Sequence, residues 1–144
     1  MSEKKKKIKK AKQKTVTSKS KNKTSKARAV VTKGKGKVLI NSIPLDIFQP
    51  DYVKKFIAEP IKMFKETTDG LDIKVNVKGG GFMSQAVAVR SAIAKGIINF
   101  TEKPEIKKVF MEYDKMLLVD DPRRKEAKKP LGKGARKKKQ ASKR

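Results

Sequence analysis

The chain has 144 residues, of which 40 are Lys or Arg and 14 are Asp or Glu, so its formal net charge is +26. A body this cationic repels itself, so we expect a polyanionic partner, and nucleic acid fits best because Lys and Arg release the counterions condensed on phosphates. A membrane is the weaker alternative, since the basic stretches hold almost no apolar residues to bury. Cys and His are absent, which excludes disulfides, thiolate zinc sites and Ser-His or Cys-His catalysis; we expect no catalytic residue, no metal and no cofactor.

The charge is concentrated at the two ends of the chain. Residues 1–28 carry +12 and residues 122–144 carry +11, whereas residues 29–121 carry only +3. Segments so poor in apolar residues do not bury enough surface to offset the entropy of ordering them. We therefore predict a Lys-rich extension over 1–27, a globular α+β domain over 28–121 and an extended basic tail over 122–144.

The start of the chain is basic, but no apolar segment follows it as in a signal peptide, and no apolar run reaches 18 residues. We therefore expect a soluble protein of a reducing compartment.

Two β-rich runs, residues 29–31 and Val38–Ile40, flank the glycine-containing sequence from Lys33 through Lys35 to Lys37. This pattern predicts an antiparallel hairpin with three lysines at its tip. Those lysines fit a solvated turn and a phosphate contact equally well.

A helix is predicted to begin at Pro50, because apolar residues recur at helical spacing after it, and Pro60 is expected to open a second short helix. Residues 71–77 alternate apolar and polar side chains, which predicts a strand with one buried face. A further helix is expected from Pro104, followed by an apolar extended run over residues 116–119. Asp120 and Asp121 precede Arg123 and Arg124, so local charge balance explains them better than metal binding.

Three glycines join the predicted strand to a long helix, with Ser84 expected as the N-cap. The apolar stripe of this helix is expected to contain Ala86, Val89, Ile93, Ile97 and Phe100, with Arg90 and Lys95 outside it. Glycines before a helix leave backbone N–H groups open to an anion. However, neither nucleotide-binding glycine motif matches, so a tight turn is an equal alternative.

From about Lys26 to Arg144 the order and spacing of these motifs resemble the universal small-subunit ribosomal protein S-nine family, and its archaeal branch most closely. The motifs are the glycine triplet with Gln85, the helix over residues 86–100, the run from Tyr113 to Arg124, and the basic sequences ending at Ser142, Lys143 and Arg144. The resemblance implies a two-layer α+β sandwich, called ribosomal-protein-S-five domain-two-like, with a left-handed β-α-β crossover.

The resemblance also implies a structural component of the small ribosomal subunit, cytoplasmic and ribosome-bound, in which the domain and tail bind rRNA in the head. Its partners would be rRNA, P-site tRNA and neighbouring head proteins, without homo-oligomers. The tip residues Ser142, Lys143 and Arg144 would approach P-site tRNA. The rRNA-binding residues would be Lys33, Lys35, Lys37, Lys78, Gly79, Gly80, Gly81, Gln85, Arg90, Arg123, Arg124, Lys128, Lys129, Lys133, Arg136, Lys137, Lys138 and Lys139.

Three other functions are less consistent with the sequence. A DNA-condensing protein would need the charge alone, without a shaped neutral domain. A free regulatory RNA-binding module would show aromatic residues on a sheet face or a GXXG clamp, whereas Phe82 is the single aromatic beside a basic loop. An enzyme would need a catalytic constellation that this sequence lacks.

Overall fold

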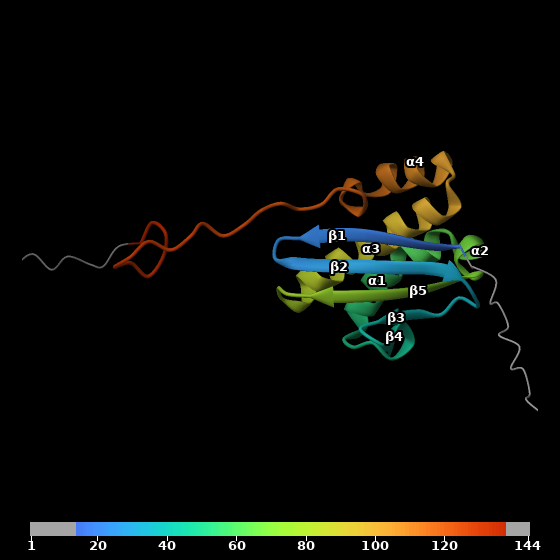
Figure 1. Cartoon of the computed structure of the whole chain (residues 1–144), viewed down its shortest axis with the longest axis horizontal. Coiled ribbons are helices and arrows are strands. Elements are labelled where there is room, and N and C mark those ends of the chain that lie inside the picture. The colour runs from blue at the N-terminus through green and yellow to red at the C-terminus, as the bar shows by residue number, and fades with distance from the viewer. Residues whose placement is uncertain (1–13, 138–144) are drawn as a thin grey trace, which may run out of the picture.

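The computed structural model describes residues 14–137. The described chain forms a five-stranded mixed sheet in the order β1-β2-β5-β3-β4 (Figure 1). The strands are β1 (Thr15–Asn22), β2 (Ser25–Lys33), β3 (Val38–Ile40), β4 (Ile43–Pro44) and β5 (Leu71–Lys78). The helices are α1 (Asp51–Met63), α2 (Lys65–Thr68), α3 (Phe82–Thr101) and α4 (Pro104–Tyr113), with short 3-10 turns η1 (Leu45–Ile47) and η2 (Lys115–Leu117).

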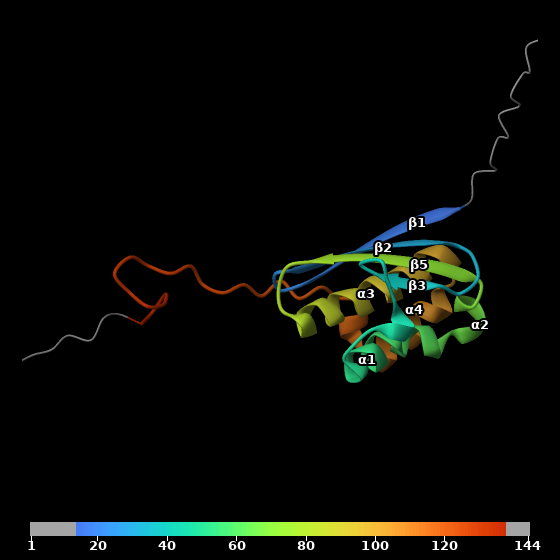
Figure 2. The same ribbon diagram turned by 90° about the horizontal axis from the view of Figure 1, so that it is seen from below.

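The helices α1 and α3 lie against one face of the sheet, which gives the two layers seen edge-on in Figure 2. Strand β5 places Leu71, Ile73, Val75 and Val77 toward these helices, as its alternating sequence predicts. The buried side chains of α3 include Ala86, Val89, Ile93 and Ile97, so the predicted stripe is confirmed for those four residues. In the helical layer Phe110 of α4 packs edge to face on Phe64, with ring centroids 5.1 Å apart.

The predicted hairpin between residues 29–31 and Val38–Ile40 is wrong. Strand β5 lies between β2 and β3, antiparallel to the first and parallel to the second. The apolar side chains of β5 are the most favourable neighbours for both strands, so a pairing distant in sequence replaces the local one. The segment from β3 through α1 to β5 is a β-α-β crossover between parallel neighbours; its left-handedness stays a prediction.

The boundary expected at residue 28 is also wrong, because it falls inside β2. Residues Thr15–Asn22, assigned to the Lys-rich extension, form strand β1, which pairs with β2 along its whole length. The side chains that β1 buries are polar and small, namely Ser18, Ser20 and Asn22. A pattern based on apolar residues does not detect them, although they alternate with exposed residues as a half-buried strand requires.

Smaller corrections concern helix ends. Helix α1 continues through Pro60, which is buried one turn before the helix ends at Met63, so few backbone hydrogen bonds are lost. Helix α3 begins at Phe82 with Gly81 as its N-cap, so Ser84 does not cap it. The run after Asp114 forms η2, with Leu117 fully buried, rather than an extended segment.

Candidate nucleic-acid interface

The face of the sheet opposite α1 and α3 is strongly basic. On β1, β2 and β5 every second side chain points away from the helices. The basic residues exposed in this way are Lys19, Lys21, Lys26, Arg28, Lys74 and Lys78. We call this set the basic sheet face.

The strand register arranges these residues in rows. Lys21 lies opposite Lys26, which lies opposite Lys78. In the next row Lys19 lies opposite Arg28, which lies opposite Asn76. Like charges directly opposite each other on neighbouring strands are destabilising. Within the described part of the chain, none of the five cationic side chains in these rows makes an ion pair. The rows therefore suit an external polyanion that supplies the missing countercharge.

The basic tail leaves the domain beside one end of this face. The Lys23 N–H donates to the Asp121 carbonyl over 3.1 Å, and the Asp121 N–H donates to the Lys21 carbonyl over 3.2 Å. The Arg123 guanidinium binds the buried Asp121 carboxylate with an Nη2–Oδ2 distance of 2.7 Å. These hydrogen bonds from Arg123 lower the pKa of Asp121 to about 2. The sequence-based expectation of charge balance between the acidic pair and the arginines is therefore confirmed for Asp121.

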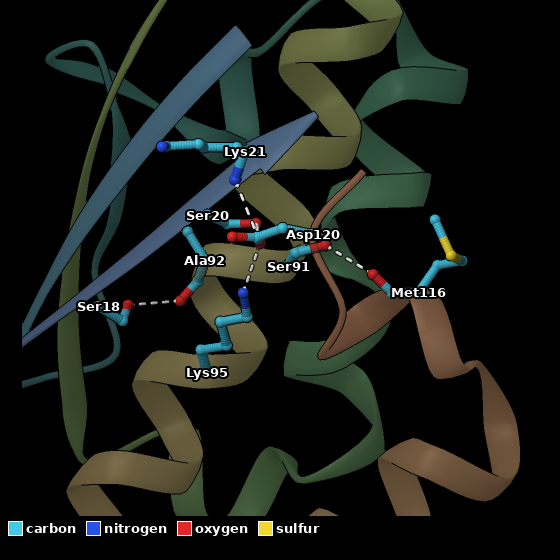
Figure 3. Close-up of polar contacts among 8 residues, drawn as sticks. All are labelled: Ser18, Ser20, Lys21, Ser91, Ala92, Lys95, Met116 and Asp120. Carbon is cyan, nitrogen blue, oxygen red and sulfur yellow. Dashed lines mark hydrogen bonds and ion pairs between the residues drawn. The ribbon is translucent and has the colours of Figure 1, made fainter. Parts of the chain in front are cut away.

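Asp120 joins three elements at the same place (Figure 3). Its Oδ1 accepts hydrogen bonds from Ser20 Oγ at 2.9 Å and from the Lys21 N–H at 3.2 Å, and Lys95 of α3 forms an ion pair with it. Burial alone would raise the pKa of Asp120, but the hydrogen bonds from Lys95, Ser20 and Lys21 lower it below 3.8 overall. Nearby, Ser18 Oγ donates to the Ala92 carbonyl over 2.7 Å. These contacts fasten β1 to α3 and hold the start of the tail.

A shallow groove between the β1–β2 turn and the tail connects the two basic regions. It is lined by Lys23, Thr24, Arg123, Arg124 and Lys125. The side chain of Arg123 remains 75% exposed beyond its contact with Asp121. The groove therefore extends the basic sheet face onto the tail, since four of its five lining residues are Lys or Arg.

The glycine junction lies against the same turn. Gly79 and Gly80 have φ angles of +79° and +71°, which favour glycine, and a Cβ on Gly80 would lie 2.1 Å from Ser25 Oγ. The Gly79 carbonyl accepts hydrogen bonds from Ser25 Oγ at 2.8 Å and from Gln85 Nε2 at 3.2 Å. The glycines thus have a structural reason, namely a tight turn packed on β2. Gly81 is open, with nothing within 4 Å of a Cβ placed there.

The lysine loop predicted as a hairpin tip lies at the opposite end of β2 and β5 (Figure 1). The Asp72 carboxylate accepts the Lys35 and Lys37 N–H groups at 2.8 and 3.1 Å. These two backbone hydrogen bonds lower the pKa of Asp72. Since the Lys35 and Lys37 amides are already satisfied by Asp72, these two residues would meet an anion through their side chains.

Arg90 does not belong to an exposed interface. Its side chain is 8% exposed and pairs with Glu59 at 2.6 Å and Asp114 at 2.7 Å. The guanidinium carbon also lies 4.4 Å from the centre of the Phe56 ring. The expectation that Arg90 contacts rRNA is therefore contradicted by its position: it links α1, α3 and the end of α4 inside the helical layer.

The described part of the tail exposes the remaining predicted cations, Arg124, Lys128, Lys129, Lys133, Arg136 and Lys137. Arg136 pairs with Glu126 at 3.0 Å on the surface. The predicted contacts Lys138, Lys139, Ser142, Lys143 and Arg144 lie outside the described residues. The sequence-based predictions did not include Lys19, Lys21, Lys26, Arg28, Lys74 and Asn76. The signal for four of them was present, because basic residues alternate with Ser or Ala over residues 18–21 and again over residues 25–29.

Two further findings concern residues 14–137. No helix in this range is both long and apolar enough to cross a membrane. No group of three or more Asp and Glu side chains in this range could hold a metal ion.

Comparison with known proteins points to one family. Residues 20–144 match the profile of the family described as Ribosomal protein S9/S16. The chain is 46% identical over 110 residues to "Small ribosomal subunit protein uS9" of Thermoplasma volcanium. This alignment covers 76% of this chain and 83% of that protein. The protein of the same name from Methanococcus maripaludis strain C7 is 44% identical over 112 residues, covering 76% of this chain and 84% of the relative.

Proposed function

Since the chain belongs to the ribosomal protein S9/S16 family, we propose that it is a structural, non-catalytic component of the small ribosomal subunit. In this role it binds rRNA through the basic sheet face, the groove beside the β1–β2 turn and the basic tail. The relatives that carry the small-subunit name align over 76% of this chain, and the family profile matches residues 20–144.

The observation that carries the rRNA contact is the pair of cationic rows across β1, β2 and β5. Each row sets like charges directly opposite each other and leaves them without an ion pair among the described residues. An arrangement that costs stability in the free protein is understandable if a phosphate backbone neutralises it in the bound state. Contacts of this kind position a protein on RNA without reading its sequence.

Sedimentation tests the proposal. A tagged chain should comigrate with small subunits in a sucrose gradient at low Mg²⁺. A variant with Lys19, Lys21, Lys26 and Arg28 changed to Gln should incorporate poorly. The matched control changes four exposed helix lysines to Gln, namely Lys55, Lys62, Lys107 and Lys108, and should incorporate normally. A free or DNA-bound wild-type chain would contradict a ribosomal role, and equal incorporation of both variants would contradict the sheet-face contact.

The proposal extends to the tip of the tail, which would approach P-site tRNA through Ser142, Lys143 and Arg144. Twenty-three residues reach at most roughly 80 Å when extended, so the tip can contact a ligand that the domain never touches. Arg144 would supply the main phosphate contact, because a guanidinium binds phosphate through two parallel hydrogen bonds.

Deleting residues 142–144 should leave assembly normal and weaken P-site tRNA binding by about 1 kcal/mol, as expected for charged contacts near solvent. The measurement is tRNA affinity of purified mutant subunits at fixed Mg²⁺ and salt. An unchanged tRNA affinity would contradict the tRNA contact. A failure of the small subunit to assemble would mean that the tip is needed for assembly rather than for tRNA binding. We further propose a cytoplasmic, ribosome-bound location, with head proteins as neighbours and no homo-oligomer.

A further inference from the structure

An apolar surface lies at the edge of the domain where β4, η1 and the first turns of α1 and α3 meet. Beneath it is a hollow of about 80 Å³, whose apolar lining includes Phe48, Val53, Val77, Phe82 and Val89. Phe82, at the start of α3, leaves 62% of its surface exposed over this hollow. Ile47, next to Phe48 in the chain, is 71% exposed, and Ile43 on β4 and Met83 on α3 are also exposed. We call this set the apolar edge.

Isolated apolar side chains on a surface are ordinary, but several around one hollow mark a contact site. Phe82 is the first residue of α3, directly after the glycine junction, and its side chain stays exposed there. The free domain therefore carries an apolar surface that its own described elements leave open.

The charge of this edge differs from that of the rest of the chain. Residues 38–53 contain no Lys or Arg, although 40 of the 144 residues in the chain are basic, and they contain Asp46 and Asp51. The ammonium of Lys54, just beyond this stretch, donates to the Asp46 carbonyl. Lys78 follows Val77 in β5 and points to the opposite face of the sheet. The only charges within residues 38–53 are therefore negative.

An RNA backbone gains little from this surface, because the carboxylates of Asp46 and Asp51 outnumber the neighbouring ammonium of Lys54. A partner protein that also binds rRNA would itself be cationic, and a chain with a net charge of +26 repels a cationic partner over most of its surface. At the apolar edge, the carboxylates of Asp46 and Asp51 would attract such a partner instead. An apolar side chain of the partner would fill the hollow, and its neighbouring Lys or Arg would meet Asp46 or Asp51.

We propose that the apolar edge docks a basic segment of a neighbouring ribosomal protein, with an apolar anchor side chain inserted beside Phe82. The inference rests on the proposed ribosomal function and adds to it a protein contact separate from the RNA interface. Two faces of one domain would then have different partners: the basic sheet face takes RNA and the apolar edge takes protein.

Photocrosslinking within assembled subunits tests this proposal. The photoreactive residue p-benzoylphenylalanine replaces Phe82, and in a matched control it replaces Tyr113, which is similarly exposed at 56% on α4. The Phe82 probe should yield one protein adduct, at a segment that combines an apolar residue with Lys or Arg. Adding Ile47→Asn, which removes apolar surface without adding charge at a site too exposed to affect folding, should lower the yield of that adduct about fivefold. Ile47→Leu should leave the yield unchanged.

An adduct to rRNA at position 82, or no adduct at all, would overturn the docking proposal. The same protein adduct from position 113 would also overturn it, because the contact would not be specific to the apolar edge. A failure of the proposed function gives a different result: the wild-type chain would not comigrate with small subunits, and both proposals would be wrong. An rRNA adduct at position 82 within normally assembled subunits would contradict the docking proposal alone.

Discussion

Two Lys-rich segments of this chain have different structures. Residues 15–26 form β1 and the start of β2, whereas residues 122–137 lie mostly exposed beyond the domain (Figure 1). The first segment alternates small polar residues with Lys, so Ser18 and Ser20 turn inward while Lys19 and Lys21 turn outward. The second contains Pro122, Pro130 and Gly132 and has no such alternation. The spacing of the charges, rather than their number, decides which segment folds.

The largest effect is expected from disturbing the packing of β1 on α3, which keeps the first segment folded. A Cβ on Gly96 would lie 2.8 Å from Val31 Cγ2 and 3.2 Å from Ser18 Oγ. Gly96→Val should therefore push the sheet from α3 and lower the free energy of unfolding by about 1–3 kcal/mol. Urea unfolding measures this loss, and amide hydrogen exchange should show residues 16–22 becoming as unprotected as the tail.

The matched control is Gly134→Val in the tail, where a Cβ meets only Lys137 Cβ at 3.8 Å. It should change the free energy of unfolding by less than about 0.5 kcal/mol. Equal stability of the two variants would mean that β1 does not depend on its contact with α3.

The glycine junction should show the next largest effect. Gly80→Val places a branched side chain at a φ of +71° and against Ser25 Oγ, so we expect a loss of roughly 1–2 kcal/mol and impaired assembly. Lys78→Ala removes one solvated charge and should have little effect on either measurement. Gly81→Val is the matched control, because its φ of -89° and open surroundings accept a side chain. If Gly80→Val assembled as well as Lys78→Ala, the tight turn would be dispensable.

Charge removal compares the two segments directly. Changing Lys19, Lys21, Lys26 and Arg28 to Gln relieves repulsion between neighbouring strands and should raise stability by several tenths of a kcal/mol. Changing Arg124, Lys125, Lys128 and Lys129 to Gln in the tail should leave stability unchanged. Both variants should lower the slope of log K against log salt for RNA by roughly 3, since each lost phosphate contact removes about 0.7–0.9. An unaltered slope in either variant would exclude that segment from RNA binding.

The smallest effect is expected on acidification. The pKa of Asp121 lies below its usual 3.8, at about 2, so this carboxylate contributes stability that is fully present above about pH 4. The contribution is lost as the pH falls through the folded-state value. Stability should therefore decrease between pH 4 and pH 2, with earlier loss of protection at the Lys23 and Asp121 amides. Asp121→Asn should show a shallower decrease, and an identical decrease would assign the effect to other carboxylates.

The sequence predicted those parts of the fold that depend on apolar periodicity. Leu71 to Val77 and the stripe from Ala86 to Ile97 are confirmed because apolar burial determines both. It did not predict β1, whose inward side chains are Ser and Asn, or the separation of β2 from β3 by β5, which depends on contacts distant in sequence. Arg90 was placed on the wrong side of its helix because a sequence pattern does not reveal buried partners such as Glu59 and Asp114. The family resemblance is confirmed, and its match begins at residue 20, inside β1.

The directions in which the chain enters and leaves the domain have a consequence for avidity. Lys14 precedes β1, whereas Pro122 begins the tail at the far end of that strand, next to Asn22. A strand of eight residues is about 26 Å long, at roughly 3.3 Å per residue. This span exceeds the Debye length of about 8 Å at physiological salt, so cations at the two ends would act on different stretches of a bound polyanion. If the proposed RNA contacts form at both ends, the rigid strand fixes the distance between them, and the second contact forms at the high effective concentration that the first one sets.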